Sequence, residues 1–265
     1  MSDSIVPNPW AELRQFTAAR IALGRAGVSV PTAPQLAFQL AHARARDAVH
    51  RELDADALMQ SLTAQLEMAC VAVHSAAPDR ATYLRRPDLG RRLDEPSRLA
   101  LAQHAAPCDI GFVIADGLSA LAIEQHALPF LREWIALAPG AMSVAPLVIV
   151  RQGRVAVGDE VAQLLGVRLV VVMIGERPGL SSPDSMGLYL TWQPQVGMTD
   201  ERRNCISNVR PAGLDLASAA RKLHYLMAEA RRRGVSGVAL KDDSVEDAPA
   251  VEDNPNFLLA LGSDT

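Results

Sequence analysis

The chain has 265 residues, 49% of them hydrophobic and only 4% aromatic, which is enough for one large domain or two smaller ones with a sizeable core. Its formal net charge is −4, but residues 241–265 hold one lysine and seven carboxylates, a net of −6, so the remainder carries only about +2. That excess is too small to indicate nucleic-acid binding.

Three helices are predicted at the start of the chain. Asn8, followed by proline, predicts a helix over 8–20. Thr32 begins a second helix, with a glutamine three residues later as its capping-box partner. Asp54 is expected to cap a third helix that runs to about Val73.

Residues 78–96 are predicted to form a basic loop punctuated by prolines. Its arginines are either solvated, which is the more common case, or directed at the acidic surface of a partner. They are Arg85, Arg86, Arg91 and Arg92. We take residues 1–95 together as an α-helical N-terminal arm or subdomain.

Strands and helices alternate from residue 97 onward. Helices are predicted over 97–106, 118–137, 157–165 and 214–233, and strands over 110–115, 147–150, 168–174, 188–192 and 206–209, with 235–240 as a candidate last strand. The alternation predicts an α/β fold, with a Rossmann-like, mostly parallel sheet over residues 96–241 preceded by the α-helical N-terminal subdomain. Residues 242–265 are acidic, and we expect them to form a disordered tail.

The loops after three predicted strands share a composition. The apolar run 169–174 predicts a strand buried on both faces, and it ends at residues 175–177, Gly-Glu-Arg. Two other strands end at glycine beside a polar residue, at 116–117 and at 152–155. Because the carboxyl ends of parallel strands meet at one edge of a sheet, we expect one ligand site built from the three loops. For any single loop, a solvated polar turn is the competing interpretation.

Motifs of self-sufficient enzymes are missing from the sequence. There is no GxGxxG after a strand, no P-loop, no HExxH and no GxSxG, and no histidine has zinc-like spacing to a cysteine. Cys70, Cys108 and Cys205 are widely spaced and odd in number, which favours a reducing cytoplasm over a disulfide framework. Cys205 lies at the start of a predicted strand. A cysteine at such a position is more often a small apolar residue that fills space than a nucleophile. We therefore expect no catalytic residue or metal ligand, but a subunit that helps to hold a cofactor while a partner performs the chemistry.

Seven ordered segments give the chain a resemblance to the small (light) subunit of ethanolamine ammonia-lyase, over nearly all of residues 8–241. They are LRQFTAARIALGRAG near the N-terminus, YLRRPDLGRRLD at 83–94, IADGLSA at 114–120, QGRVAVGDE at 152–160, IGERPGLSSPDS at 174–185, RRNCISNVR at 202–210 and SGVALKD at 236–242. So many segments in one order make chance agreement improbable.

The resemblance implies a lyase that uses adenosylcobalamin to convert ethanolamine to acetaldehyde and ammonia. In this family, homolysis of the cobalt–carbon bond gives an adenosyl radical that abstracts hydrogen from the substrate, and amine migration and elimination follow. The large subunit, a TIM barrel, carries the substrate-binding residues, and the small subunit closes over the cobalamin at the subunit interface. The implied assembly is a heteromer of this chain with the large subunit, with several copies of each.

The same resemblance implies which residues touch the cofactor. The contacts fall on Val155 in the QGRV segment, Glu176 in the GERPG segment and Cys205 in the NCISN segment. Glu176 would accept hydrogen bonds from polar groups of the cofactor, and Val155 and Cys205 would supply apolar and backbone contacts. None of the six histidines has a glycine three residues on, as the base-off motif DxHxxG requires, so base-on adenosylcobalamin is expected.

The sequence also bears on location and on competing functions. The start, MSDSIVPNPW, lacks a secretory signal, and no apolar stretch is long enough to cross a membrane, so we expect a cytoplasmic protein. The family is associated with bacterial microcompartments through an N-terminal extension, but this chain begins almost directly at NPW, which leaves encapsulation open. Two other interpretations remain: a standalone α/β binding protein for a nucleotide-like ligand, and a structural scaffold without a ligand.

Overall fold

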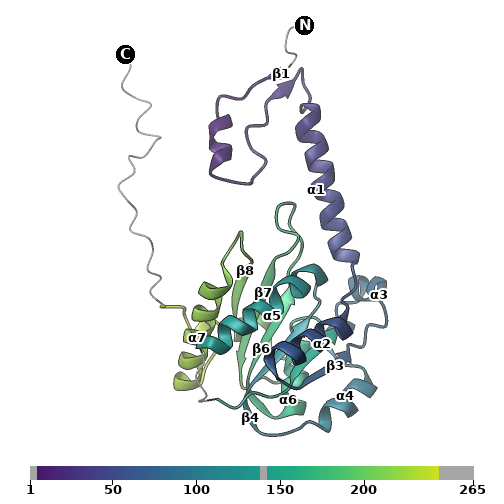
Figure 1. Ribbon diagram of the computed structural model, residues 1–265, viewed down its shortest axis with the longest axis vertical. Helices are drawn as coiled ribbons and strands as arrows, with labels where there is room; N and C mark the ends of the chain where they lie inside the picture. Colours follow the sequence, from purple (N-terminus) through teal and green to yellow (C-terminus); the bar gives the residue numbers. More distant parts are fainter. Residues whose placement is uncertain (1–4, 138–141, 245–265) are drawn as a thin grey trace.

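A six-stranded sheet forms the centre of the computed structural model, which describes residues 5–137 and 142–244. The strand order is β3-β5-β4-β6-β7-β8, and Figure 1 shows the sheet surrounded by helices. The first four strands in this order are parallel, whereas β7 and β8 continue the sheet antiparallel. The strands are β3 (Cys70–His74), β4 (Cys108–Ala115), β5 (Leu147–Arg151), β6 (Val167–Gly175), β7 (Met186–Trp192) and β8 (Arg203–Val209). The prediction of a mostly parallel α/β sheet is confirmed.

Helices cover both faces of the sheet and enclose two apolar clusters. On one face, α2, α5 and α7 bury the larger cluster, and on the other face α4 and α6 bury the smaller one. Short 3₁₀ turns occupy Leu89–Arg91, Asp200–Arg202 and Gly237–Ala239. The helices are α2 (Ala55–Leu66), α3 (Arg80–Arg85), α4 (Glu95–Ala102), α5 (Ala120–Leu137), α6 (Val157–Leu165) and α7 (Leu216–Arg233).

The pattern of apolar residues in β6 and β7 determines which faces of each strand are buried. Residues 169–174 of β6 are all buried, as their continuous apolar run predicts. In β7, Leu188 and Leu190 point into the larger cluster, while Tyr189 between them packs beside the smaller one and is only half-buried. The side of β7 and β8 that carries Tyr189 is therefore less covered than the other side.

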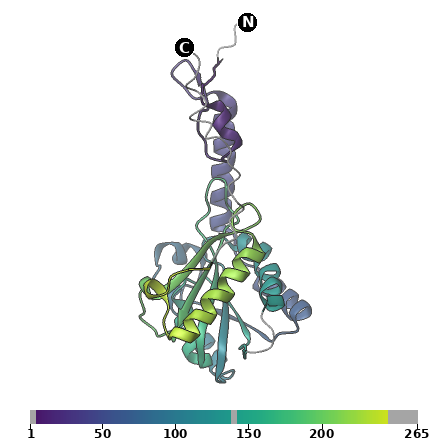
Figure 2. The same cartoon turned by 90° about the vertical axis from the view of Figure 1, so that its left-hand side faces the viewer.

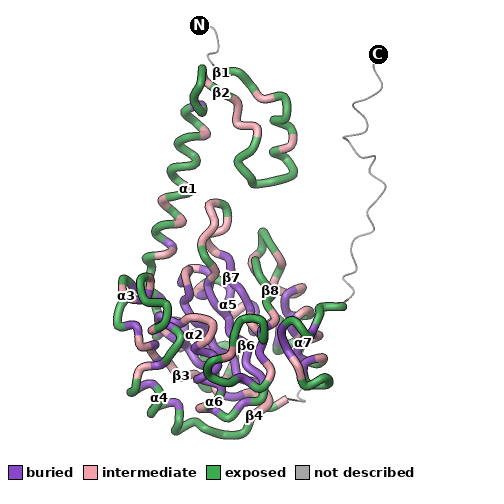
Figure 3. The backbone as a smooth tube through the Cα atoms, turned by 180° about the vertical axis from the view of Figure 1, so that it is seen from behind, coloured by how far each residue is buried: buried purple, intermediate pink, exposed green. Residues whose placement is uncertain are grey.

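A long arm made of residues 5–50 projects from the sheet. Its stem is α1 (Thr32–His50), and its tip is formed by the paired strands β1 (Ile5–Val6) and β2 (Arg25–Ala26) with a 3₁₀ turn at Ala11–Gln15. Figure 2 shows the arm as a stalk above the body, and Figure 3 shows that most of it is exposed. Among its residues only Pro31 and Ala48 are buried.

The expected helix over 8–20 is wrong, because only the 3₁₀ turn at Ala11–Gln15 forms there. The Asn8 side chain caps a local turn by accepting a hydrogen bond from Trp10 N at 2.9 Å, and Thr17 does the same for Ala19 N at 3.1 Å. No residue of the 3₁₀ turn is buried. Since short helices are marginal without a packed face, these local turns prevail over the apolar spacing.

The expected third helix is also wrong over its last part, where β3 stands instead. Asp54 caps α2 as predicted, by accepting a hydrogen bond from Ala57 N at 2.9 Å. The helix stops at Glu67, which adopts a left-handed φ of 55°. The following residues then pair in parallel with β5. The sheet therefore includes residues that precede position 96, although the division of the chain at 95 and 96 stays a prediction.

Smaller differences concern helix ends and one strand. The candidate last strand over 235–240 is wrong, because residues 237–239 form a 3₁₀ turn. Thr32 is the first residue of α1, but no side chain caps that helix, and α4 is capped by Asp94 rather than Ser97. The predicted tail over 242–265 lies almost entirely outside the described residues. Within the described ranges, no helix is long and apolar enough to cross a membrane.

Candidate functional site

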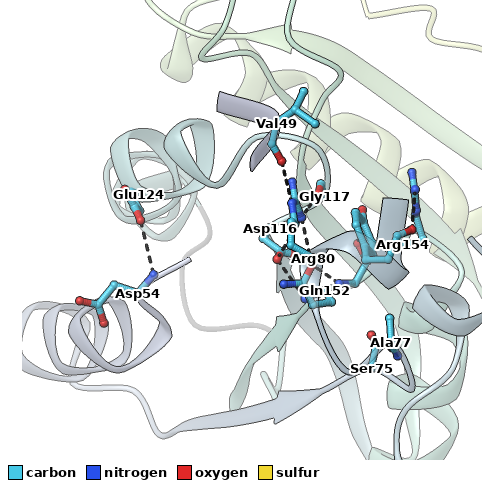
Figure 4. A network of polar contacts seen from close by, with 12 residues as sticks. Val49, Asp54, Ser75, Ala77, Arg80, Asp116, Gly117, Glu124, Gln152 and Arg154 are labelled. Atoms are coloured by element: carbon cyan, nitrogen blue, oxygen red, sulfur yellow. Dashed lines mark hydrogen bonds and ion pairs between the residues drawn. The ribbon is translucent and has the colours of Figure 1, made fainter. Parts of the chain in front are cut away.

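The loops that follow β4, β5 and β6 meet at one edge of the sheet, as the sequence predicts, and Figure 4 shows the contact between the first two. The loop after β4 lies in the middle and touches both neighbours. Leu118 N donates a hydrogen bond of 2.8 Å to the carbonyl of Gly175. Gly117 approaches so closely that a Cβ atom there would lie 2.2 Å from the same oxygen, which explains why glycine occupies this left-handed position.

Asp116 is turned inward and organises the loop after β5. Its carboxylate is 1% exposed and accepts hydrogen bonds of 3.0 Å from Gln152 N and 3.0 Å from Gly153 N. Burial raises the pKa of this carboxyl group, while the Arg80 guanidinium and the backbone N–H groups oppose that rise. Asp116 thus supports the loops and does not itself face a ligand.

Val155 ends the loop after β5 and lies just before the first turn of α6. Its side chain is half-buried against the smaller apolar cluster. The preceding Arg154 stacks over the ring of Tyr83, with 4.2 Å from its guanidinium carbon to the ring centre, and its backbone N–H donates to Gly90 O at 2.7 Å. The loop that presents Val155 is therefore held from outside by residues of the segment 83–90.

Glu176 is the first residue after β6, and its carboxylate is held at one oxygen. Oε2 accepts a hydrogen bond from the Ser185 hydroxyl and another of 3.1 Å from Asn208 N. Within the described residues, Oε1 accepts no hydrogen bond. The side chain lies over Gly187, where a Cβ atom would come within 2.9 Å of Oε1. Glu176 is thus a fixed carboxylate with one open acceptor.

Cys205 lies beside Glu176 on the less covered side of β7 and β8. It pairs with Tyr189 across the two strands and is exposed. Burial of its sulfur by surrounding atoms raises the pKa of the Cys205 thiol, a hydrogen bond from Tyr189 lowers it, and the negative charge of Glu176 raises it further. Burial, together with Cys205 and Glu176, also raises the pKa of Tyr189. The thiol and the phenol therefore stay neutral at physiological pH, next to a carboxylate.

The three predicted cofactor residues lie on two neighbouring parts of this surface. Glu176 and Cys205 are brought together around Gly187 and Tyr189, which we call the β7–β8 patch: Glu176, Gly187, Tyr189 and Cys205. Val155 lies apart on its own loop, and it packs against the same apolar cluster as Tyr189. The sequence did not single out Tyr189, although its position between two apolar residues of a strand indicates a side chain on the opposite face.

Several polar residues of the loop 177–185 are used inside the protein. Ser185 binds Glu176, and Asp184 forms an ion pair of 2.7 Å with Arg210. Ser119 donates a hydrogen bond of 2.7 Å to Pro183 O, which fixes the far side of the loop. These contacts shape the loop, and the Ser185 hydroxyl is less available to a ligand than the sequence predicts. Among the residues described, no group of three or more His, Cys, Asp and Glu could hold a metal ion.

The basic segment 78–96 is folded against the body. It forms α3 and a 3₁₀ turn, and Arg92 pairs with the buried Glu160 of α6 at 3.3 Å. Arg86 pairs with Asp88 at 2.6 Å in an exposed position. Part of this basic charge is therefore neutralised within the chain.

The fold defines an α/β protein with a mostly parallel six-stranded sheet, and the patch lies on the less covered side of its last two strands. Comparison with known proteins gives the family. The family model described as ethanolamine ammonia-lyase light chain (EutC) matches residues 7–241. The chain is 57% identical over 265 residues to the ethanolamine ammonia-lyase small subunit of Ralstonia nicotianae, an alignment that covers 97% of this chain and 96% of the relative. It is 55% identical over 262 residues to that of Azotobacter vinelandii, covering 96% and 97%. The chain belongs to the ethanolamine ammonia-lyase light-chain family, and the predicted enzyme class, a lyase, is confirmed.

Proposed function

We propose that this chain is the small subunit of an adenosylcobalamin-dependent ethanolamine ammonia-lyase and supplies part of the cobalamin site. The reaction is the conversion of ethanolamine to acetaldehyde and ammonia, and the large subunit carries the substrate site. The observation that carries the proposal is the match of the light-chain family over residues 7–241, and the β7–β8 patch is our candidate for the cofactor contact. Bound adenosylcobalamin supplies the radical that starts the reaction.

The residues present fit a corrin cofactor. Cobalamin is a broad, flat group with amide side chains around its rim, so it needs an open surface and hydrogen-bond acceptors at that surface. In the patch, Cys205 is exposed, Tyr189 and Glu176 are half-buried, and Gly187 is buried beneath the Glu176 side chain. Glu176 offers Oε1 as an acceptor in a position fixed through Oε2. Val155 adds apolar contact from the neighbouring loop, and the absence of DxHxxG from the sequence supports base-on binding.

The arm supports assembly with the large subunit. Its exposed apolar side chains are more numerous than a monomeric protein usually leaves uncovered. They include Ile5, Val6, Trp10, Ile21, Val28, Val30, Leu36, Phe38 and Leu40. The arm also carries five arginines against only Glu12 and Asp47. We assign it as a principal contact of this chain with an apolar, acidic surface of the large subunit, in a heteromer with several copies of each chain. Either the cytoplasm or a bacterial microcompartment suits such an assembly.

The test is an assay of acetaldehyde release from ethanolamine with added adenosylcobalamin. The purified chain is assayed alone and then as a complex co-expressed with the large subunit from the same source. We expect activity only in the complex. Absence of activity in a folded stoichiometric complex would exclude ethanolamine as the substrate, and ligand binding by the isolated chain without any complex would favour a standalone binding protein.

A second measurement tests the patch. Glu176→Gln keeps the shape of the side chain but removes its charge, and Glu133→Gln, on the exposed surface of α5, is the matched control. We expect Glu176→Gln to weaken cyanocobalamin binding by the complex about tenfold, or ~1.4 kcal/mol, as for the loss of a charge-assisted hydrogen bond. Equal affinities for the two variants would favour a scaffold that does not contact the cofactor.

A further inference from the structure

Arg80, at the start of α3, is a buried cation that joins three separate segments (Figure 4). Its Nε donates a hydrogen bond of 2.7 Å to Val49 O, in the last turn of α1. Its Nη1 donates to Gly117 O at 2.9 Å and to the side-chain oxygen of Gln152 at 3.2 Å. One guanidinium group thus links the stem of the arm to the loops after β4 and β5.

The loop after β5 needs such support, because its backbone is in an uncommon conformation. Gln152 has a left-handed φ of 56°, which is unfavourable for a residue other than glycine. Asp116 holds the N–H groups of Gln152 and Gly153, and Arg80 lies 3.5 Å from that carboxylate. The Tyr83 hydroxyl, also from α3, donates to Gly153 O at 3.1 Å. The conformation of the loop that presents Val155 therefore depends on α3 as well as on the sheet.

Val49, which accepts the hydrogen bond from Arg80 Nε, lies across a groove from the loop that follows Glu176. Val49 lines a groove with its α1 neighbours, including Arg46 and His50, and with residues 177–180 on the opposite wall. A bond that fixes Val49 to Arg80 therefore also fixes one wall of this groove. Arginine is suited to this link, because the N–H groups on Nε and Nη1 of its planar guanidinium point in different directions and reach separate acceptors at once.

We propose that Arg80 is a positioning residue that holds loop 152–155 and the base of α1 in one fixed arrangement, so that Val155 is set for cofactor contact. This inference rests on the proposed function. Arg80 touches neither the patch nor any proposed cofactor contact directly, so it acts through Gln152 and Asp116. Its loss is expected to affect cofactor binding rather than the chemistry that follows.

Hydrogen–deuterium exchange tests the positioning role without any cofactor. In Arg80→Met, we expect the amides of residues 152 and 153 to exchange at least tenfold faster, while amides in the middle of β4 are unchanged. Arg51→Met is the matched control, because Arg51 ties the same end of α1 to Glu124 of α5 but not to the loop. It should change exchange at 152 and 153 less than twofold. Unchanged exchange in Arg80→Met would overturn the proposal.

Two milder variants keep the test decisive if Arg80→Met destabilises the whole chain. Arg80→Lys keeps the charge beside Asp116 but cannot reach Val49 O and Gly117 O together, so intermediate exchange at 152 and 153 is expected. Gln152→Asn tolerates the left-handed backbone and withdraws only the side-chain bond to Arg80. We expect at least threefold faster exchange at 153. Wild-type exchange in both variants would overturn the proposal.

Cyanocobalamin binding by the complex with the large subunit, followed by absorption, tests the link to the cofactor. We expect the Kd to rise about tenfold in Arg80→Met and less than twofold in Arg51→Met, with kcat at saturating adenosylcobalamin changed less than the KM for it. Faster exchange with an unchanged Kd would refute the role of Arg80 in cofactor binding. A wild-type complex that binds no cyanocobalamin would instead refute the proposed function, and the exchange data would still decide whether Arg80 positions the loop.

Discussion

The arm and the sheet body differ in how their apolar side chains are used. In the body, the strands and helices bury two apolar clusters, and the buried carboxylates Asp116 and Asp159 have partners within the chain. In the arm, apolar side chains occur at a helical or strand spacing but nearly all face outward. An element whose apolar face finds no partner in its own chain is stabilised only when another chain supplies one. The comparison indicates that the body folds around its own core, and it supports our proposal that the arm serves association.

The largest expected effect is on the free energy of unfolding, when the same substitution, leucine to alanine, is made in the body and in the arm. Leu147 in β5 is 0% exposed, whereas Leu36 in α1 is 59% exposed. Leu147→Ala should lower the free energy of unfolding by about 2–5 kcal/mol, because it leaves a cavity in a packed core. Leu36→Ala should change it by less than about 0.5 kcal/mol. Urea titration of the two variants, followed by circular dichroism, measures the difference. Similar losses would show that the arm shares the core of the body.

The elements of the body were predictable because local pattern and burial agree there. The uninterrupted apolar run of β6 and the segment 157–165 of α6 have the expected positions. Since strands of this kind place their carboxyl ends together, the meeting of the loops after β4, β5 and β6 followed from the order of the elements.

The errors lie where the sequence lacks a local signal. From residue 54 to 73 the chain reads as one helix, and only the left-handed Glu67 marks the boundary before β3. Over 8–20 the spacing of apolar residues would give a helix an apolar face. The spacing does not show whether another part of the chain packs against that face. Arg80 was not identified for a different reason. Its partners Asp116 and Gln152 are 36 and 72 residues away, and no periodicity links them.

The next effect tests whether the arm is an interface. Leu36→Glu combined with Leu40→Glu places two charges on neighbouring turns of α1 and leaves the body untouched. We expect the affinity for the large subunit to fall at least tenfold, or ~1.4 kcal/mol, because carboxylates would have to be desolvated in the contact. Val238→Glu, at a position 79% exposed on the body, is the control and should leave the affinity unchanged. Titration calorimetry with the purified large subunit gives both values, and unchanged affinity in the double variant would exclude this face of the arm from the contact.

The smallest effect concerns a partly exposed part of the body, the β7–β8 patch. Cys205 is exposed, and its raised pKa leaves less thiolate at pH 8 than a free cysteine has, so iodoacetamide should modify it slowly at pH 8 and faster as the pH rises.

Glu176→Gln sharpens this test, because removing the neighbouring negative charge lowers the pKa of Cys205 and increases its thiolate fraction. The rate at pH 8 should rise by less than about tenfold, because the charge of Glu176 is the smallest of the three causes that shift the pKa of Cys205. Peptide mass spectrometry distinguishes Cys205 from the half-buried Cys70 and Cys108. If the patch is open in the free chain and covered by cobalamin in the complex, added cyanocobalamin should slow modification of Cys205 alone. An equal rate with and without the cofactor would place cobalamin elsewhere on the molecule.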